Sequence, residues 1–535
     1  MVSSFFAINT SAALLPIVTS ICFLLLIAIF IHSFQSGLVF IFFAGLMTSI
    51  GGLMATLGIL QFYEFLPAGL QTASPPSVLQ FNRNFFGSSQ VLFLPFALSC
   101  AYLSKGAKRV LSIGSIGLII WSISISQTRS AVMSMLVFGF LLILLVALRS
   151  WRNITDNRHK FVFVGLAFLF IGFSAVIGNN YFGGITKNIK VFFDHDSTNR
   201  AQSSIEERLT IWKESIDIIK KNPIIGVGPG NWQIHIADAE NQPHRVKSGR
   251  VSSNRAHNVY LEVLSESGAI GLLFYLSFVI LSLILLLKYF FKESNGILVV
   301  FMGGGFIGFL SDQFFSFPNL QPTHIVMVAF FLGYIYYQEP SVSLNKVTKP
   351  ALKLFQIALP LLSSIALYLY ITFFFFEKNM ASAEKHQALG DVNTALYYLN
   401  NASQSVHSID RSGDPPELRK AMIYNQINKP EMSLEALHIA WKKHPTNPRI
   451  FATYGDAYSR QGDTKNASIY YQKAFAVQSR NFVLGRNLAI AYFELQEFQK
   501  CLDTLTKLGK TAVQNDPKLI SMYRLLQLKT GKPLK

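Results

Sequence analysis

The chain has 535 residues, of which 51% are hydrophobic and only 14% are charged, against a charged share of about 25% in ordinary soluble domains. Apolar blocks of membrane-spanning length fill the sequence from residue 11 to about residue 376, so a wholly soluble protein is excluded. The net charge of +18 is attributed to membrane topology rather than to nucleic-acid binding, because the basic residues gather in alternate short loops.

The chain is predicted to cross a membrane about ten times before a soluble tail begins. The expected spans are centred in residues 11–31, 37–62, 86–104, 107–124, 130–148, 161–178, 268–288, 295–315, 322–337 and 354–376. Runs of this kind suit helices, which need about 20 apolar residues to cross the hydrocarbon core. The predicted fold class is therefore all-α, with a membrane helix bundle over residues 1–376 and a second domain over residues 377–535.

Positive charge indicates which side of the membrane each loop faces. The loops after the third, fifth, seventh and ninth predicted spans carry Lys105, Lys108 and Arg109, then Arg149, Arg152, Arg158 and Lys160, then Lys288 and Lys292, and last Lys346, Lys349 and Lys353. Cytoplasmic loops collect Lys and Arg, so these four loops are predicted to be cytoplasmic. The long loop 179–256 and the C-terminal tail then face the opposite side.

Two arginines break this charge rule on the outward side. Arg83 lies in "QFNRNFFGSS" and Arg129 in "SQTRSAVMS", each beside the start of a predicted span. An arginine at a helix end commonly reaches to the membrane surface as an anchor. A fixed guanidinium also suits a phosphate or pyrophosphate, and the helix start at Ser130 would add backbone donors. Both interpretations stay open for Arg129, whereas the anchor is favoured for Arg83.

The long outward loop contains a predicted amphipathic helix and then a glycine-rich turn. Apolar residues recur at helical spacing over 209–219, with Arg208 at the start and Pro223 just after the end. The next letters, "GVGPG", predict a tight turn around Gly228. They match neither a dinucleotide-binding fingerprint nor a P-loop, and the histidines nearby have no metal-ligand spacing.

The stretch "RAHNVYLEVLSESGAIGLLF", residues 255–274, joins this loop to the seventh predicted span. It contains a His-Asn-x9-Gly-x2-Gly pattern that begins at His257. If the stretch is helical, His257, Leu261, Leu264 and Gly268 fall near one face, and the histidine caps an apolar stripe. Its imidazole is then suited to act as general base for a hydroxyl at the membrane surface. The alternative is an interfacial histidine with no chemical role.

The tail repeats with a period of 34 residues. Tyr424, Tyr458 and Tyr492 close the similar strings "AMIY", "GDAY" and "AIAY", and small and aromatic residues follow at helical spacing. This pattern resembles tetratricopeptide repeats and predicts an α-solenoid over residues 377–535, with a degenerate first unit at 385–402. Such a domain offers a groove to a protein partner and carries no chemistry of its own.

Taken together, the His257 motif, the segment 208–232 and the "SQTRSA" segment resemble the O-antigen ligase/polymerase superfamily over roughly residues 80–340. The resemblance implies a glycosyltransferase of the bacterial inner membrane that needs no metal and no cofactor. Such an enzyme moves a preassembled glycan from undecaprenyl pyrophosphate to an acceptor hydroxyl on the periplasmic face. The long loop and the tail would then be periplasmic.

The resemblance also implies roles for particular residues. Arg129 and Arg208 would hold the pyrophosphate leaving group, and His257 would activate the acceptor hydroxyl. Asn258 would orient the histidine, and Arg255 is added because it lies two residues before it. The substrate-binding candidates are Arg255, Asn258, Arg83 and Gly228.

Several functions remain open at this point. The leading one is ligation of O-antigen to lipid A–core; a protein O-oligosaccharyltransferase and an O-antigen polymerase share the donor chemistry and differ in acceptor. Outside this class, a transporter or flippase would place charged residues inside its spans, where Asp312 and Glu262 are the exceptions noted. A membrane scaffold would use the repeats alone and leave the His257 motif unexplained.

Overall fold

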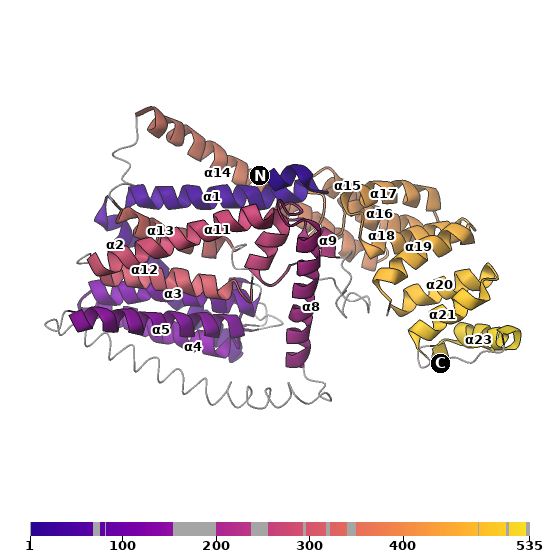
Figure 1. Cartoon of the computed structure of the whole chain (residues 1–535), viewed down its shortest axis with the longest axis horizontal. Helices are drawn as coiled ribbons and strands as arrows, with labels where there is room; N and C mark the ends of the chain where they lie inside the picture. Colours follow the sequence, from indigo (N-terminus) through magenta and orange to yellow (C-terminus); the bar gives the residue numbers. More distant parts are fainter. Residues whose placement is uncertain are drawn as a thin grey trace.

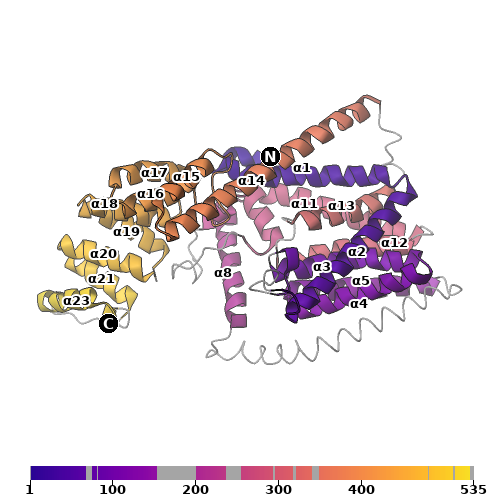
Figure 2. The ribbon, with the colours of Figure 1, turned by 180° about the vertical axis from the view of Figure 1, so that it is seen from behind.

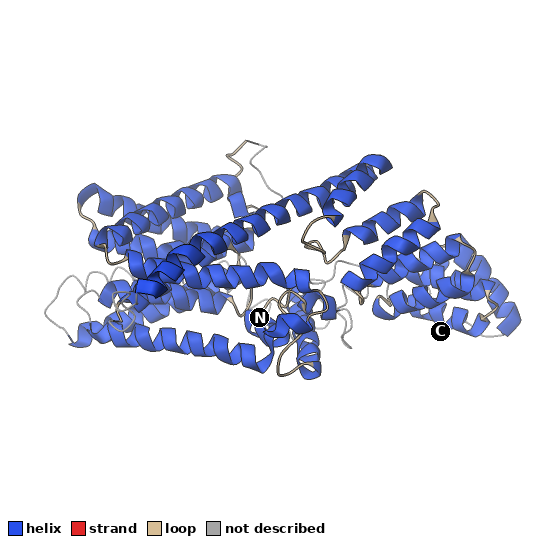
Figure 3. Cartoon of the chain, turned by 90° about the horizontal axis from the view of Figure 1, so that it is seen from above, coloured by secondary structure: helices blue, strands red, loops and turns tan. Residues whose placement is uncertain are grey.

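A computed structural model describes residues 2–67, 75–80, 82–152, 200–236, 255–292, 296–316, 321–339, 349–479, 481–509 and 513–530. Every regular element within these residues is a helix, and no strand occurs among them (Figure 3). The helices form a bundle of long apolar helices at one end of the molecule and a stack of shorter helices at the other (Figure 1). The predicted all-α class is confirmed for the described residues.

The membrane bundle is built from nine helices among the described residues. They are α1 (Thr10–Ser33), α2 (Gly37–Phe62), α3 (Arg83–Leu103), α4 (Gly106–Ile125), α5 (Arg129–Arg152), α11 (Val259–Lys292), α12 (Gly296–Asp312), α13 (Pro322–Tyr337) and α14 (Lys349–Ala388). Each coincides with one of the predicted spans, and the remaining prediction, 161–178, lies outside the described residues. Six of the nine contain a stretch long and apolar enough to cross a membrane; the apolar parts of α5, α12 and α13 are shorter. The number of spans therefore stays a prediction.

Aromatic side chains fill the centre of this bundle. Helix α3 packs against α2, α4, α5, α12 and α13. The ring of Phe330 on α13 stacks on Phe43 at 4.4 Å and meets the edge of Phe96 at 5.2 Å. Each such aromatic pair contributes about 0.5–1.5 kcal/mol beyond the area that it buries, so this cluster holds α2, α3 and α13 together.

The two ends of the bundle differ in charge. Helices α3 and α5 begin side by side, because the Thr128 hydroxyl donates to the Arg83 carbonyl at 3.1 Å. The lysines of the α3–α4 turn, and Lys288 with its ion pair to Glu339 at 2.6 Å, belong to the opposite end. Within the described residues, the basic residues Lys105 and Lys288 thus lie at one end of the bundle and the predicted site residues at the other. The side of the membrane that each end faces stays a prediction.

Helix α8 (Arg200–Lys221) stands across this second end, between the bundle and the stack of short helices (Figures 1 and 2). Its predicted apolar face is only partly covered: Ile211 and Ile218 are buried, whereas Leu209 and Ile216 are exposed. Lys213 and Lys220 are also exposed. A glycine-rich turn and the short helix α9 (Trp232–His235) follow it. The turn has positive φ at Gly226, Gly228 and Gly230, which confirms the predicted tight turn.

Helix α11 is broken at Gly268, which has φ 65° and ψ −169°. The two residues after the break are bonded to the glycine-rich segment, because the N–H of Ala269 donates to Pro223 at 2.9 Å and that of Ile270 donates to Ile224 at 3.3 Å. A Cβ atom at position 268 would overlap the Ile224 carbonyl. Only glycine satisfies both the backbone angles and the lack of space.

The second domain is a stack of helix pairs. It contains α15 (Val392–Ser403), α16 (Pro416–Gln426), α17 (Pro430–Lys443), α18 (Pro448–Arg460), α19 (Thr464–Val477), α20 (Phe482–Glu494), α21 (Phe498–Leu508) and α23 (Pro517–Thr530). Helices α17, α19 and α21 begin 34 residues apart, which is the period read from the sequence. The assignment to tetratricopeptide repeats stays a prediction.

Helix α14 joins the two domains without interruption. It runs for 40 residues from Lys349 to Ala388, so the boundary expected after residue 376 falls inside it. Phe376, Met380 and Ala383 on its second half are buried against α15 and Ile423 of α16. The last membrane segment is therefore also the first helix of the second domain.

We expect Gly268→Ala to lower the stability of the protein, because the backbone angles alone cost about 1–3 kcal/mol for a residue with a side chain. The thermal midpoint of the detergent-solubilised protein should fall. Gly114→Ala on α4 is the matched control, since no atom lies within 4 Å of a Cβ there, and its midpoint should not fall. An unchanged midpoint in Gly268→Ala would contradict the described break.

Candidate functional site

His257 lies just before helix α11 and not within it. The helix begins at Val259, and the Asn258 side chain caps it by accepting the N–H of Leu261 at 3.0 Å. The condition under which His257 and Gly268 would share one helical face is therefore not met, because the histidine precedes the helix and Gly268 breaks it. The cause is local: an asparagine favours the cap position, and His257 itself has φ 52°, a left-handed conformation that ends regular structure.

An ion pair holds the loop that carries His257. The guanidinium of Arg255 donates to Glu262 at 2.9 Å, and the second carboxylate oxygen of Glu262 accepts the N–H of Ala256 at 3.1 Å. The indole N–H of Trp212 on α8 donates to the carbonyl of Ala256 at 3.1 Å. The backbone of Ala256 is thus hydrogen-bonded through both its N–H and its carbonyl. The charge of Arg255 is paired with that of Glu262.

Arg208 is the charged neighbour of His257. Burial and the positive charge of Arg208 lower the pKa of the imidazole from 6.5 to about 4, because both disfavour the protonated form. The imidazole is therefore neutral at physiological pH and able to accept a proton. Arg208 also acts electrostatically on Asp312, a buried residue at the end of α12.

Asp312 links this pair to the start of α5. Its carboxylate lies beside the buried residues Ser88 and Ser130, and Ser130 directly follows Arg129. Arg129 and Arg83 are both exposed at this end of the bundle. The structure thus brings Arg208 and His257 together, and places Arg129 and Arg83 at the rim of the same region. Their catalytic and binding roles remain predictions.

Gly228 has a different environment. Its N–H donates to the Glu266 carbonyl at 2.8 Å, and a Cβ there would press on Ala7 and on the carbonyl of Ser3. It is buried between α11 and the N-terminal segment. This position gives Gly228 a packing role, and its predicted contact with substrate finds no support in the geometry.

Two functional candidates were not identified as site residues from the sequence alone. Glu262 and Asp312 stood out there only as charges in apolar segments, although a buried ionisable group in a membrane segment is itself a signal of function. The asparagine before an apolar run was a local sign that α11 begins at Val259. Among the described residues, no group of three or more His, Cys, Asp or Glu side chains is placed to hold a metal ion; metal independence stays a prediction.

Most of the predicted site residues lie within the part of the chain that matches a known protein family. Residues 114–276, which include Arg129, Arg208 and His257, match the family model described as O-Antigen ligase. This chain is also similar to a general O-oligosaccharyltransferase of Acinetobacter baylyi, with 29% identity over 186 residues; the match covers 32% of this chain and 29% of that protein. The two matches support the superfamily that the motifs resemble, and a glycan transferase of the ligase type.

The Arg255–Glu262 pair is expected to stabilise the site. Measured as thermal unfolding in a double-mutant cycle of Arg255→Gln and Glu262→Gln, the coupling should be about 0.5–3 kcal/mol, as for contacting residues in one network. Lys500→Gln and Glu497→Gln, in an exposed ion pair, are the control variants. Each single variant of the Arg255–Glu262 pair should lower the thermal midpoint more than they do. Additive effects of the two substitutions would show that the pair contributes nothing.

Proposed function

We propose that the protein transfers a preassembled glycan from undecaprenyl pyrophosphate to an acceptor hydroxyl, on the periplasmic face of the bacterial inner membrane. The acceptor oxygen attacks the anomeric carbon of the first sugar and gives its proton to His257. The bond from that carbon to the pyrophosphate oxygen breaks, and its electron pair leaves with the pyrophosphate. Arg208 and Arg129 stabilise the charge on the leaving group.

The observation that carries this proposal is a partly buried, neutral histidine beside the positive charge of Arg208. Arg255 forms an ion pair with Glu262 at 2.9 Å, and burial together with the charge of Arg208 lowers the pKa of His257. An anion bound beside Arg208 would favour the protonated form of the nearby histidine, which is the form that a general base reaches after it accepts a proton. The matched family segment contains both residues.

The donor itself would improve the base. The pyrophosphate brings negative charge beside Arg208, so it offsets the effect of that arginine and raises the pKa of His257. The imidazole becomes a stronger proton acceptor only when the donor is bound. Proton transfer is thereby coupled to donor binding.

Two acceptors are considered. Lipid A–core is the acceptor that the family description, O-Antigen ligase, suggests, and it leads on the sequence motifs. A Ser or Thr hydroxyl of a protein is favoured by the relative described as a general O-oligosaccharyltransferase and by the second domain, which could receive a protein. Both acceptors require the same donor chemistry at Arg208 and His257.

A transfer assay with purified protein, undecaprenyl-pyrophosphate-linked glycan and EDTA tests the proposal. Lipid A–core and a Ser/Thr-rich protein compete as acceptors. His257→Ala should lower the rate by about 10²- to 10⁴-fold, the usual contribution of a general base, and His438→Ala, at an exposed position of α17, should leave it unchanged. Transfer that EDTA abolishes, or that survives in His257→Ala, would overturn the mechanism. Glycan movement without transfer would indicate a flippase.

The pH dependence of transfer should follow the charges around His257. The acidic limb of kcat/KM, which reports the free enzyme, is expected near pH 4, the pKa of the imidazole. The limb of kcat should lie at higher pH, because the bound donor raises that pKa. Arg208→Gln should move the kcat/KM limb upward, since a positive neighbour is lost. Lys213→Gln, an exposed position on the same helix, is the control; a limb that does not move in Arg208→Gln would contradict the arrangement.

A further inference from the structure

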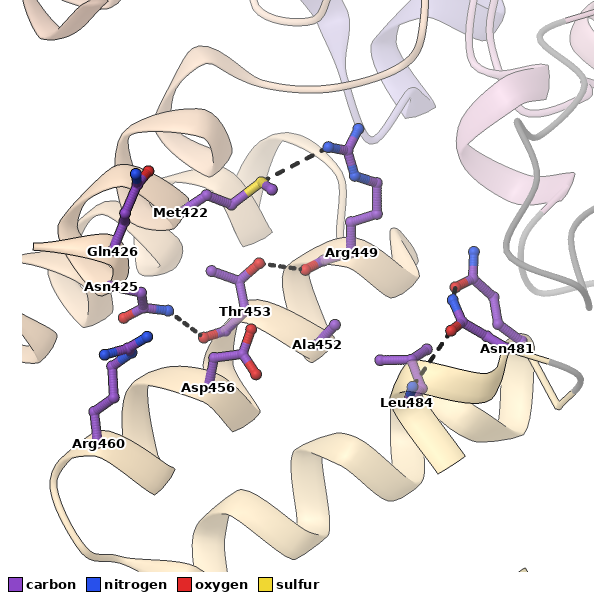
Figure 4. Close-up of a pocket in the computed structure, with 11 residues that line it drawn as sticks. Met422, Asn425, Gln426, Arg449, Ala452, Thr453, Asp456, Arg460, Asn481 and Leu484 are labelled. Carbon is purple, nitrogen blue, oxygen red and sulfur yellow. Dashed lines mark hydrogen bonds between the residues drawn. The ribbon is translucent and has the colours of Figure 1, made fainter. Parts of the chain in front are cut away.

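A pocket opens in the second domain, between α16, α18 and the start of α20 (Figure 4). Its volume is about 380 Å³. Both ends of α18 line it, since Arg449 lies in the first turn and Arg460 is the last residue. At a rise of about 1.5 Å per residue these arginines are about 16 Å apart along the helix axis, which is the length of about five residues of extended chain.

Asn425 supplies a buried acceptor to this pocket. The residue is only 5% exposed, and its amide N–H₂ donates to the carbonyl of Thr453 at 3.0 Å. Its Oδ1 atom is buried and has no hydrogen-bond partner among the described residues. A buried acceptor in this state has lost its hydrogen bonds to water without replacement, which costs free energy. A ligand that brings a donor to Asn425 would recover this free energy.

The other polar groups of the pocket offer both donors and acceptors. Asp456 accepts the hydroxyl of Tyr471 at 2.7 Å and lies within the electrostatic reach of Arg460, whose side chain is exposed. The described residues that line the pocket include apolar Met422, Ala452 and Leu484 and no aromatic residue. A polypeptide main chain presents N–H and C=O groups in alternation and matches this set. A sugar ring would find no aromatic face to lie on.

One end of the pocket adjoins the membrane domain. Thr446, three residues before Arg449, donates its hydroxyl to the carbonyl of Ile234 in α9. Close by, Asn9 before α1 donates to the carbonyl of Lys443 at 3.1 Å. The side chain of Trp232 in α9 packs in one cluster with Ala256, the residue next to His257. A chain lying along α18 would therefore leave the pocket beside the segment that holds the catalytic loop.

We infer that this pocket binds the acceptor as an extended polypeptide, held by its main chain at Asn425, Asp456 and Arg460 and directed along α18 toward the membrane domain. The inference rests on the proposed function and names its acceptor as a protein. The binding energy is gained several residues away from the reacting hydroxyl. Acceptors long enough to lie in the pocket then bind more tightly than short ones, at the same rate of chemistry.

The test compares two fluorescein-labelled peptides made of Ala, Gly and Pro with a single Thr, one of 20 residues and one of five. With the full-length protein, the 20-residue peptide should have the lower KM and an equal kcat. Asn425→Ala or Arg460→Ala should raise its KM roughly tenfold, as expected for one lost hydrogen bond of about 1.4 kcal/mol, and leave the five-residue peptide unaffected. Arg524→Ala, an exposed arginine on α23, is the matched control. Arg460 is also exposed, so we expect its substitution to leave the fold intact.

Anisotropy of the 20-residue peptide, measured without donor, separates this inference from the proposed function. Binding that weakens in Asn425→Ala and Arg460→Ala supports the pocket even if no transfer occurs, an outcome in which the proposed function fails. Transfer that requires His257 but shows equal KM for both peptides, or no change in the two variants, overturns the pocket and leaves the function intact. Displacement of the peptide by a lipid-free oligosaccharide would also overturn it, because the pocket would then hold glycan.

Discussion

The close approach of two backbones at Gly268 determines the geometry of the candidate site. The glycine-rich segment after α8 lies against the break in α11, and the Ile224 carbonyl occupies the space that a side chain would need. The break separates the first turns of α11, which carry Glu262 and follow His257, from the part that lies in the bundle. Because α8 ends in the same segment, Arg208 and His257 are held by elements that share one rigid contact, and neither depends on a free loop.

The arginines of the candidate site have different surroundings. Arg255 forms an ion pair with Glu262, so it fixes the loop that carries His257 and its charge is largely neutralised. Arg208 faces His257 and the buried Asp312, and Arg129 stays exposed at the rim. The proposed pyrophosphate site would use both arginines.

Local and periodic features were readable from the sequence, and features that depend on distant partners were not. Apolar runs predicted nine of the described helices, because hydrophobic length is set by the membrane alone. The 34-residue repeat likewise predicted the helix pairs. By contrast, Asp312 and its neighbours come from α12, α3 and α5, and no local pattern reports such contacts. At His257 the apolar period suggested a helix, but the capping preference of Asn258 decided where it begins.

The uninterrupted course of α14 has a consequence for how the protein can vary. A helix transmits rotation as well as distance, so one residue inserted between its membrane part and Phe376 would turn the second domain by about 100° as well as lift it by about 1.5 Å. The contacts of Thr446 with Ile234 and of Lys443 with Asn9 could not follow such a turn. Changes of about seven residues, close to two whole turns, would restore the angle but add about 10 Å of height. The number of residues in this helix is therefore constrained twice, because it sets both the rotation of the second domain about the helix axis and its distance from the membrane bundle. A flexible linker would impose neither constraint.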